Sequence, residues 1–361
     1  MRTTPVLVAI AIGLALPWSG CRMETVPAAP ARPNRVVMGY YPSWARAELA
    51  PAEIAFQNLT HLAHAFAWPD AAGALVVPEG FLDPVLNAAA RAAGVKMMLA
   101  LGGGGHSQGF PALSASAAGR ARFISEVVGF CEAHGYDGVD LDWEFVSNEA
   151  ERAGFTALVE ALAAALKSRS PALLLTMAAP ARNFHSRWID FERLADDFDF
   201  IGFMTYDYHG AWSAHSGHNA PLRPSAADAC GSLDETFLYA LGRGIPAGKV
   251  LLGLPFFGRS FDCGGLGLPF TSSRGWDHKD VAGLPAAEWT RVWDNEAQVP
   301  WKRRADGRMM ISYDDPGSIS LKCQYVKDKG AAGVIIWALG ADHRAGRSEL
   351  LEVVGRSFGV R

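Results

Sequence analysis

Eight short apolar segments are spaced along the sequence, with amphipathic or polar stretches between them. They are Val36–Tyr41, Leu59–Trp68, Val95–Leu101, Gly138–Trp143, Leu173–Ala178, Phe200–Tyr206, Val250–Pro255 and Val334–Leu339. Most are rich in Val, Ile, Leu or Met and are bounded by Gly, Pro or Asp, which is typical of strands buried on both faces. The pattern therefore predicts a parallel sheet covered by helices.

Stretches with a helical repeat of apolar positions separate these segments. The clearest are Phe81–Ala93, Ala117–His134, Glu149–Arg169 and Ala226–Arg243. Such alternation over eight strands favours an α/β fold, the (β/α)8 TIM barrel. A doubly wound sheet is the alternative, but it rarely needs so many strands. Between Phe261 and Ile311 the alternation stops, and Gly, Trp and Pro occur throughout. We expect an insertion there, about residues 262–312, after strand seven on the face where barrel loops build a site.

The first 34 residues have a different character from the rest of the chain. Arg2 precedes an apolar run from Pro5 to Trp18, which is short for a membrane span but suits a signal peptide. The run ends in Trp18-Ser19-Gly20-Cys21, which is similar to a lipoprotein cleavage box, although Trp18 stands where Leu is usual. We therefore predict a signal peptide over 1–20, lipidation of Cys21 and a Pro/Ala-rich tether over 21–34. Ordinary secretion and an uncleaved core segment are the alternatives.

Composition narrows the class of protein. Half of the 361 residues are hydrophobic and 19% are charged, so residues 35–361 can form a globular core. A net charge of −4 gives no basic excess, and we expect no nucleic-acid partner. Five cysteines are too few for a disulfide scaffold. With Cys21 set aside, the other four allow three pairings, which stay open, and Cys131 lies in a helical pattern that favours a buried thiol.

The segment Asp137–Glu144, DGVDLDWE, carries the clearest chemical signal. Side chains alternate along a strand, so Asp140, Asp142 and Glu144 share one face, about 7 Å apart at successive Cα positions. The other face is apolar and should pack on helices, which directs the acids into the barrel. A solvated surface strand and a structural network of buried acids are the alternatives.

Three carboxyl groups in a confined interior cannot all be charged at low cost. Burial and like charge raise their pKa values. Glu144 is outermost, at the end of the strand where barrel enzymes act, so we expect its carboxyl to stay protonated near neutral pH and to suit a general acid.

The acidic strand resembles the DxxDxDxE motif of family 18 glycoside hydrolases, the chitinase family. Further segments resemble the same family: GFMTYDYHGAW (Gly202–Trp212), GHNAPL (Gly217–Leu222), GLPFFGRSF (Gly253–Phe261) and IIWAL (Ile335–Leu339). The resemblance extends over roughly residues 35–346. The expected insertion resembles the small α+β domain of the family branch with deep clefts.

The resemblance implies a retaining, substrate-assisted hydrolysis in which the substrate's own N-acetyl group is the nucleophile. In this scheme Glu144 protonates the glycosidic oxygen and Asp142 binds the acetamide N–H. Asp140 tunes the charge of Asp142, the Tyr206 hydroxyl holds the acetamide oxygen, and Asp207 orients the same sugar.

Sugars present flat apolar faces, so aromatic side chains should line the cleft. The resemblance places Trp337 beneath the sugar at the cleaved bond. Further candidates for substrate binding are Tyr40, Trp44, Phe66, Trp212, Arg259 and Met204, although a tryptophan is more often a core residue. Two residues depart from the family pattern, because Ala100 replaces a usual Ser near the inner aspartate and Gly104 replaces a usual Trp on the leaving-group side.

The glycine run and the histidines do not indicate a phosphate-binding or metal site. Gly102–Gly105 lacks the spacing of a phosphate loop. His61 and His64 are three apart on a strand and face opposite ways, and a solvent-exposed role is expected for His215 and His218. The sequence therefore implies no metal and no organic cofactor.

The pattern as a whole predicts a chitinase that hydrolyses β-1,4-linked N-acetylglucosamine polymers or oligomers. The alternatives are a hydrolase of another N-acetylglucosamine glycan, either peptidoglycan or an N-glycan core, and a chitin-binding lectin on the same barrel. Such lectins typically lose the acid at the position of Glu144, which this chain keeps. We expect a monomer that is exported, held at the membrane through Cys21 or otherwise periplasmic or secreted.

Overall fold

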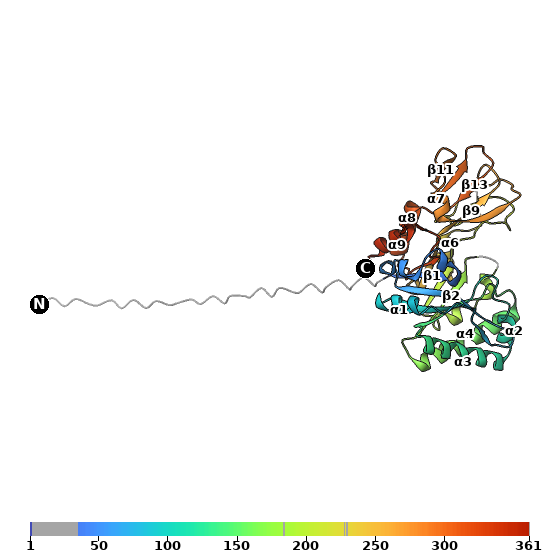
Figure 1. Ribbon diagram of the computed structural model, residues 1–361, viewed down its shortest axis with the longest axis vertical. Helices are drawn as coiled ribbons and strands as arrows, with labels where there is room; N and C mark the ends of the chain where they lie inside the picture. The colour runs from blue at the N-terminus through green and yellow to red at the C-terminus, as the bar shows by residue number, and fades with distance from the viewer. Residues whose placement is uncertain (2–34, 183–184, 227, 229, 361) are drawn as a thin grey trace. The chain divides into compact units, whose positions relative to one another are not determined.

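The computed structural model describes residues 1, 35–182, 185–226, 228 and 230–360 (Figure 1). The predicted signal peptide beyond Met1, the tether and Cys21 lie outside the described residues. The chain divides into two units, Met1–Pro33 and Asn34–Arg361, and the fold below is that of the second unit.

Eight parallel strands close into a barrel, which confirms the predicted TIM barrel. They are β1 (Val36–Pro42), β2 (His61–Pro69), β4 (Lys96–Gly102), β5 (Gly138–Asp142), β6 (Leu174–Pro180), β7 (Phe200–Met204), β8 (Val250–Pro255) and β14 (Gly333–Trp337). Each pairs with its neighbours in that order, and β1 pairs with both β2 and β14, so the sheet has no open edge within the ring. Short β3 (Leu75–Val76) adds to β2.

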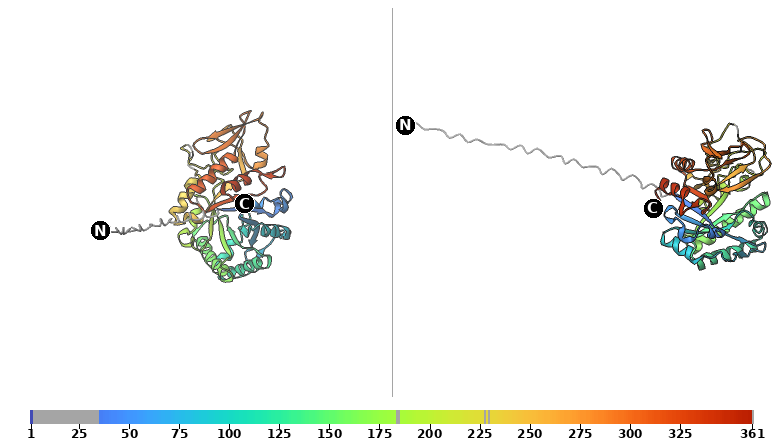
Figure 2. Two further views of the ribbon diagram at one scale, coloured as in Figure 1. Left: turned by 90° about the vertical axis from the view of Figure 1, so that its left-hand side faces the viewer. Right: turned by 45° about the horizontal axis from the view of Figure 1, so that its top comes forward.

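Helices cover the outside of this ring, and α3 and α4 lie side by side on it in both sets of views (Figures 1 and 2). The helices are α1 (Pro84–Ala92), α2 (Phe110–Ala115), α3 (Ala117–His134), α4 (Glu149–Arg169), α5 (Phe191–Leu194), α6 (Leu233–Gly242), α8 (Pro316–Asp328) and α9 (Glu349–Phe358). The side chains of Ser116 and Asn148 cap the first turns of α3 and α4, which begin and end where the apolar repeat predicts. Among the described helices, none combines the length and the apolar character needed to cross a bilayer.

Two predicted helices begin later than the apolar repeat indicates. The repeat predicts a helix from Phe81, but α1 begins at Pro84, after the cap at Asp83. The apolar repeat predicts a helix from Ala226, but α6 begins at Leu233. The Ser232 hydroxyl accepts a hydrogen bond from the Glu235 N–H at 3.2 Å and donates one to the Glu235 carboxylate at 3.1 Å. Gly231 before it has a φ of 115°, a conformation that does not continue a helix. The local cap therefore overrides the longer apolar repeat.

The segment after β8 forms a five-stranded antiparallel sheet in the order β10-β9-β13-β12-β11. Its strands are β9 (Phe257–Phe261), β10 (Ser273–Asp277), β11 (Trp289–Asp294), β12 (Val299–Arg304) and β13 (Met310–Ser312), with helix α7 (His278–Ala282) between the second and third. The first strand begins at Phe257, earlier than the expected start near 262. Val281, Trp289, Ile311 and Tyr313 form a separate apolar core for this sheet.

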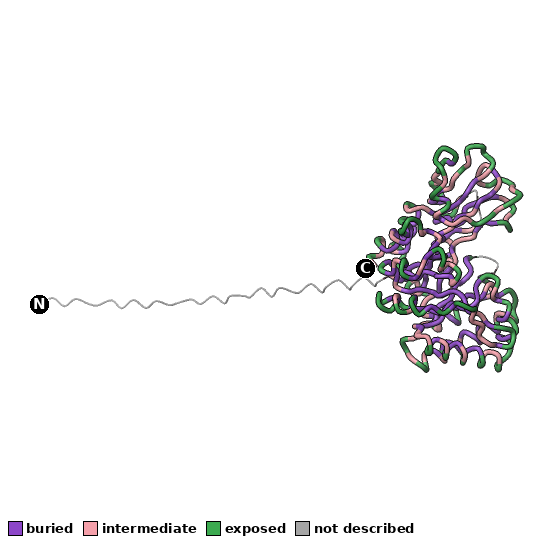
Figure 3. Tube along the Cα trace, viewed as in Figure 1, coloured by how far each residue is buried: buried purple, intermediate pink, exposed green. Residues whose placement is uncertain are grey.

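Buried residues concentrate in the barrel strands and beneath the helices (Figure 3). Strand β5 shows the division, because Val139, Leu141 and Trp143 join the core between barrel and helices, whereas Asp140 belongs to the opposite face. The four described cysteines are free, and Cys131 is a buried thiol, as its helical pattern predicts.

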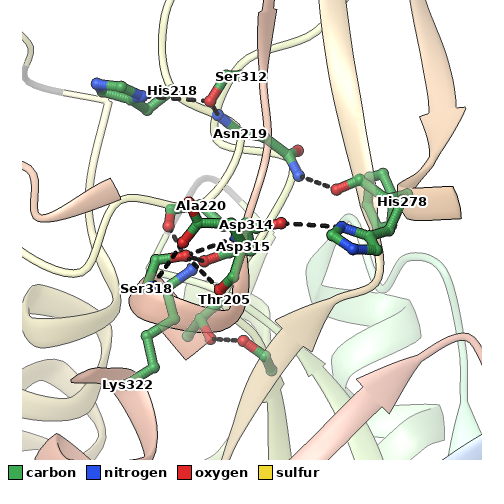
Figure 4. A network of polar contacts seen from close by, with 12 residues as sticks. Thr205, His218, Asn219, Ala220, His278, Ser312, Asp314, Asp315, Ser318 and Lys322 are labelled. Atoms are coloured by element: carbon green, nitrogen blue, oxygen red, sulfur yellow. Dashed lines mark hydrogen bonds and ion pairs between the residues drawn. The ribbon is translucent and has the colours of Figure 1, made fainter. Parts of the chain in front are cut away.

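A buried ion pair joins α8 to the loop that follows the insertion. The Lys322 ammonium lies 2.6 Å from the Asp314 carboxylate and donates to the Ala220 carbonyl at 2.6 Å (Figure 4). Both charged side chains are at most 1% exposed, so each depends on the other for compensation of its charge.

Lys322→Met should lower the free energy of unfolding by about 3–5 kcal/mol, because it leaves the Asp314 charge buried and unpaired. Lys322→Met combined with Asp314→Leu should cost clearly less than the single change. Denaturant unfolding of the three proteins measures this. A double variant that is no more stable than Lys322→Met would contradict the interpretation.

Candidate active site

An open cavity of about 650 Å³ lies at the carboxyl ends of the barrel strands. Its lining includes most of the residues that sequence analysis singles out: Tyr40, Trp44, Phe66, Asp142, Glu144, Met204, Tyr206, Asp207, Trp212, Arg259 and Trp337. A second cavity of about 360 Å³ shares Trp44, Asp207, Arg259 and Trp337 with the first and extends past Trp276 of the insertion. The fold thus gathers residues from six separate segments into one cleft.

Asp140 is the innermost acid and is fully buried. Its carboxylate accepts a hydrogen bond from the Tyr40 hydroxyl at 2.6 Å and another from the Thr176 hydroxyl at 2.5 Å. Burial raises the pKa of Asp140, and the two hydroxyls oppose that rise. Asp140 is therefore a buried acid with both oxygens satisfied.

Asp142 and Glu144 lie further out and face the cavity. Burial raises the pKa of Asp142 well above its ordinary value, and the neighbouring Glu144 and Asp140 raise it further. Burial also raises the pKa of Glu144 to about 7, with repulsion from Asp207 as the second cause. Among the described residues, the buried Oδ1 of Asp142 has no hydrogen-bond partner.

The loop after β4 holds this pair of acids in place. The Glu144 N–H donates to the Ser107 hydroxyl at 2.9 Å, and the Gly103 N–H donates to the Asp142 carbonyl at 2.7 Å. Gly102 has a φ of 104°, and a Cβ there would lie 2.3 Å from the Asp142 carbonyl oxygen. Its glycine therefore serves close backbone packing beside the acids, which explains part of the glycine run.

Tyr206 and Asp207 follow β7 and approach the acids from the other side. Burial raises the pKa of Tyr206, and Asp142, Glu144, Asp207 and Asp140 raise it further, so its hydroxyl keeps its proton. The Arg259 guanidinium donates to the Asp207 carboxylate at 2.7 Å. Asp207 has a φ of 58°, an uncommon conformation for a residue other than glycine.

The predicted aromatic residues occupy three different environments. Trp337 packs against Tyr40 and Phe66, with ring centroids 5.8 Å apart in each pair. Tyr40 is buried with its hydroxyl on Asp140, so it is foremost a partner of that acid and offers little open ring face. Trp44 and Trp212 are 62% and 63% exposed at the rim, and the Arg259 guanidinium lies 5.1 Å from the Trp212 ring.

The two departures from the family pattern have different structural consequences. Ala100 pairs in register with Asp140, and the Thr176 hydroxyl from the other neighbouring strand bonds that carboxylate. Gly104 is exposed and lines the cavity, and the three atoms nearest to an added Cβ there belong to the Glu144 carboxyl group, at 3.6 Å or more. The wall beside Glu144 is therefore open at Gly104.

Sequence reasoning missed several residues of the site. Thr176 pairs in register with Asp140 on the adjacent strand, but that register is a property of the fold and could not be predicted from the sequence. Ser107, and the stacked rings of Phe145 and His185 that line the cavity 4.6 Å apart, also carry no signal in the sequence.

The expectation of a solvent role for His218 is wrong. His218 is buried, and one ring nitrogen lies 3.2 Å from the Ser312 hydroxyl (Figure 4). The other ring nitrogen lies 3.1 Å from the Asp294 carboxylate. Both partners come from the insertion, which is distant in sequence, so the local pattern gave no sign of them.

One group among the described residues has the donor types of a metal site. Ligand atoms of His209, Asp228 and Cys230 all lie within 4.8 Å of one another. His209 Nε2 is hydrogen-bonded to Asp228 at 2.7 Å, and burial raises the pKa of Cys230 to about 11, which keeps its thiol protonated. The hydrogen bond accounts for the geometry, and we assign no metal to this group.

A TIM barrel with a row of buried acids at the carboxyl end of one strand is a frame for acid–base chemistry on a bound ligand. The family model for Glycosyl hydrolases family 18 matches residues 36–342, and the chain belongs to that family. The chain is 33% identical to chitinase 1 of Aphanocladium album over 270 residues. That match covers 70% of this chain and 63% of the fungal protein, so the chain spans less than two thirds of the length of that relative.

Solved structures agree with the fold. Catalytic domain 2 of the group II chitinase of Ostrinia furnacalis aligns with a TM-score of 0.84 and 25% identity, over 91% of this chain and 97% of that chain. Human YKL-39, described as a pseudo-chitinase with retained chitooligosaccharide binding properties, aligns with a TM-score of 0.84 and 25% identity, over 90% of this chain and all of that one. The same fold therefore occurs in a chitinase catalytic domain and in a protein described as a pseudo-chitinase.

We expect the Glu144 carboxyl to titrate near pH 7 in a ¹³C NMR titration, since its pKa is raised to about 7. Asp207→Asn should lower that pKa, because it removes the second cause of the rise. A wild-type Glu144 that titrates near its ordinary value of 4.5 would show that the carboxyl is better solvated than its surroundings indicate.

Proposed function

We propose that this protein is a chitinase that hydrolyses β-1,4-linked N-acetylglucosamine chains with retention of configuration. One observation carries the proposal: Asp142 lines the cavity and has a buried Oδ1 without a hydrogen-bond partner among the described residues, beside a carboxyl with a pKa of about 7. An unpaired buried acceptor is costly, and a substrate N–H would satisfy it. An acetamide group supplies such an N–H.

The proposed reaction follows from the positions of Glu144, Asp142 and Tyr206 around the cavity. Glu144, protonated near neutral pH, gives its proton to the glycosidic oxygen as the C1–O bond breaks. The acetamide oxygen attacks C1 and forms an oxazolinium ion, while Asp142 accepts the acetamide N–H and stabilises its growing positive charge. The Tyr206 hydroxyl stays protonated and can donate a hydrogen bond to the acetamide oxygen. Water then opens the ring at C1, and Glu144 takes the proton from that water.

The two cavities support a chain-like substrate. The first holds the acids, and the second continues past Trp337 and Trp44 toward Trp276, so several sugars can lie along one path. Asp207 and Arg259 form a pair where the two cavities meet and can bind sugar hydroxyls there. Peptidoglycan or an N-glycan core would present the same acetamide, and a comparison of turnover on those two substrates with turnover on chito-oligosaccharides distinguishes them.

A chitin-binding lectin is the remaining alternative, because the related YKL-39 is described as a pseudo-chitinase that retains chitooligosaccharide binding. Glu144 in this chain, with its raised pKa, argues for hydrolysis. Measured turnover separates the two functions.

Glu144→Gln should lower kcat on chito-oligosaccharides by several orders of magnitude, while oligomer binding persists, because the amide keeps the shape but has no proton to give. Product analysis with oligomers of several lengths, together with calorimetric binding, measures both. Glu149→Gln, which changes an exposed acid at the start of α4, is the matched control and should leave kcat unchanged. Equal turnover by wild type and Glu144→Gln, or turnover of chains without N-acetyl groups, would overturn the proposal.

We further propose that the chain is exported and anchored to a membrane by a lipid on Cys21, on the strength of the apolar run before Trp18-Ser19-Gly20-Cys21. The mature protein should incorporate labelled palmitate and sediment with membranes. Cys21→Ser should remove the label and release the protein. A wild-type protein without label that is found in the soluble fraction would instead indicate ordinary secretion.

A further inference from the structure

Asn219 is buried, and it forms hydrogen bonds both with the segment that follows β7 of the barrel and with the insertion. Its backbone N–H donates to the Ser312 hydroxyl at 2.9 Å (Figure 4), and its carbonyl accepts from the Tyr208 N–H at 3.1 Å. Its carboxamide Nδ2 donates to the Phe257 carbonyl at 3.3 Å, which sets the orientation of the amide. That orientation directs Oδ1 at the Asp207 N–H, 3.2 Å away.

Asp207 needs such a restraint because of its backbone conformation. A φ of 58° is uncommon for a residue with a Cβ, and although Asp adopts it more readily than most, contacts with its surroundings stabilise it. Arg259 holds the Asp207 carboxylate from one side, at 2.7 Å. The Asn219 amide oxygen accepts a hydrogen bond from the backbone N–H of Asp207, the residue that follows Tyr206.

We propose that Asn219 is a positioning residue of the proposed glycosidase site, which fixes the Asp207 carboxylate and the Tyr206 hydroxyl relative to Glu144. Asn219 reaches no substrate in this arrangement and acts only through Asp207. The inference rests on the proposed function for its catalytic consequence, but its electrostatic consequence can be measured without turnover.

The loop itself does not depend on the Asn219 amide. Ala220, the next residue, accepts a hydrogen bond from the buried Lys322 ammonium, and Ser312 is held in turn by His218 (Figure 4). These contacts use backbone groups or other side chains. Removing the amide should therefore free Asp207 while the loop stays in place.

The electrostatic consequence has a definite sign. The groups around Glu144 are Asp142 on β5, Tyr206 and Asp207 after β7, and the Gly104 N–H after β4, while His185 after β6 also lines the cavity. Burial and the Asp207 charge raise the pKa of Glu144, and the Gly104 N–H lowers it. An Asp207 carboxylate that moves away from Glu144 therefore lowers that pKa.

The test compares Asn219→Ala with Ser312→Ala. The first removes the amide that holds Asp207, whereas the second removes a hydroxyl that bonds the Asn219 backbone on its other side. Both lose buried hydrogen bonds, so both should lower Tm. Only Asn219→Ala should move the basic limb of the kcat/KM profile to lower pH, by roughly half a unit. Its kcat should fall roughly tenfold to a hundredfold, as expected for a misplaced reacting group.

A ¹³C titration of Glu144 in the same proteins gives a readout that needs no substrate. The inference expects a lower Glu144 pKa in Asn219→Ala and an unchanged one in Ser312→Ala. Asn219→Ser, which leaves a hydroxyl too short to reach Asp207, should give the same direction if the alanine variant does not fold.

The outcomes distinguish the positioning role of Asn219 from the proposed chitinase function. A shift confined to the Asn219 variants supports the positioning role. Equal shifts in Asn219→Ala and Ser312→Ala, or a loss of Tm with an unchanged Glu144 titration, would overturn it. A wild-type protein that does not turn over chito-oligosaccharides would overturn the proposed function, while the titration would still decide the role of Asn219.

Discussion

The site depends on three carboxyl groups that lie close together at the end of a closed barrel: Asp140 and Asp142 are buried on one face of β5, and Glu144 is half-buried just beyond the end of that strand. Charged carboxylates are expensive to bury, and three side by side repel one another. The protein meets this constraint unevenly along the strand. Asp140, deepest, receives two hydroxyl hydrogen bonds, whereas Asp142 keeps an unpaired oxygen and Glu144 has a pKa raised to about 7. Along the strand toward the cavity, the carboxyl groups therefore change from fully hydrogen-bonded to available for substrate.

The surrounding fold maintains this gradient. Ser107 holds the Glu144 backbone, and Asn219 holds Asp207, whose charge contributes to the Glu144 pKa. The insertion has a role beyond extending the cleft, because Ser312 and Phe257 bond Asn219 from its strands. The barrel and the insertion are thus connected through polar contacts that end beside the acids. The Lys322 ammonium, paired with Asp314, also holds the loop that contains Asn219, because it donates to the Ala220 carbonyl.

The strengths and failures of sequence reasoning follow from the range of the interactions. Helices α3 and α4 could be predicted to the residue, because their apolar repeats and N-caps lie in the same short segment. The apolar repeat predicts too early a start for helix α6, because the cap at Ser232 lies inside that repeat. The prediction for His218 is wrong because its partners, Ser312 and Asp294, lie far along the chain.

The aromatic candidates came from the family resemblance, but the sequence by itself determined the strand alternation and the inward face of Asp140, Asp142 and Glu144. Those features depend on periodicity and composition within a few residues, which folding does not alter. Only the tertiary structure decided that Thr176 takes the place of a hydroxyl absent at Ala100, that the wall at Gly104 is open, and that Asn219 holds Asp207. These outcomes require strands and loops distant in sequence to meet at hydrogen-bonding distance, and no local pattern records which of them will do so.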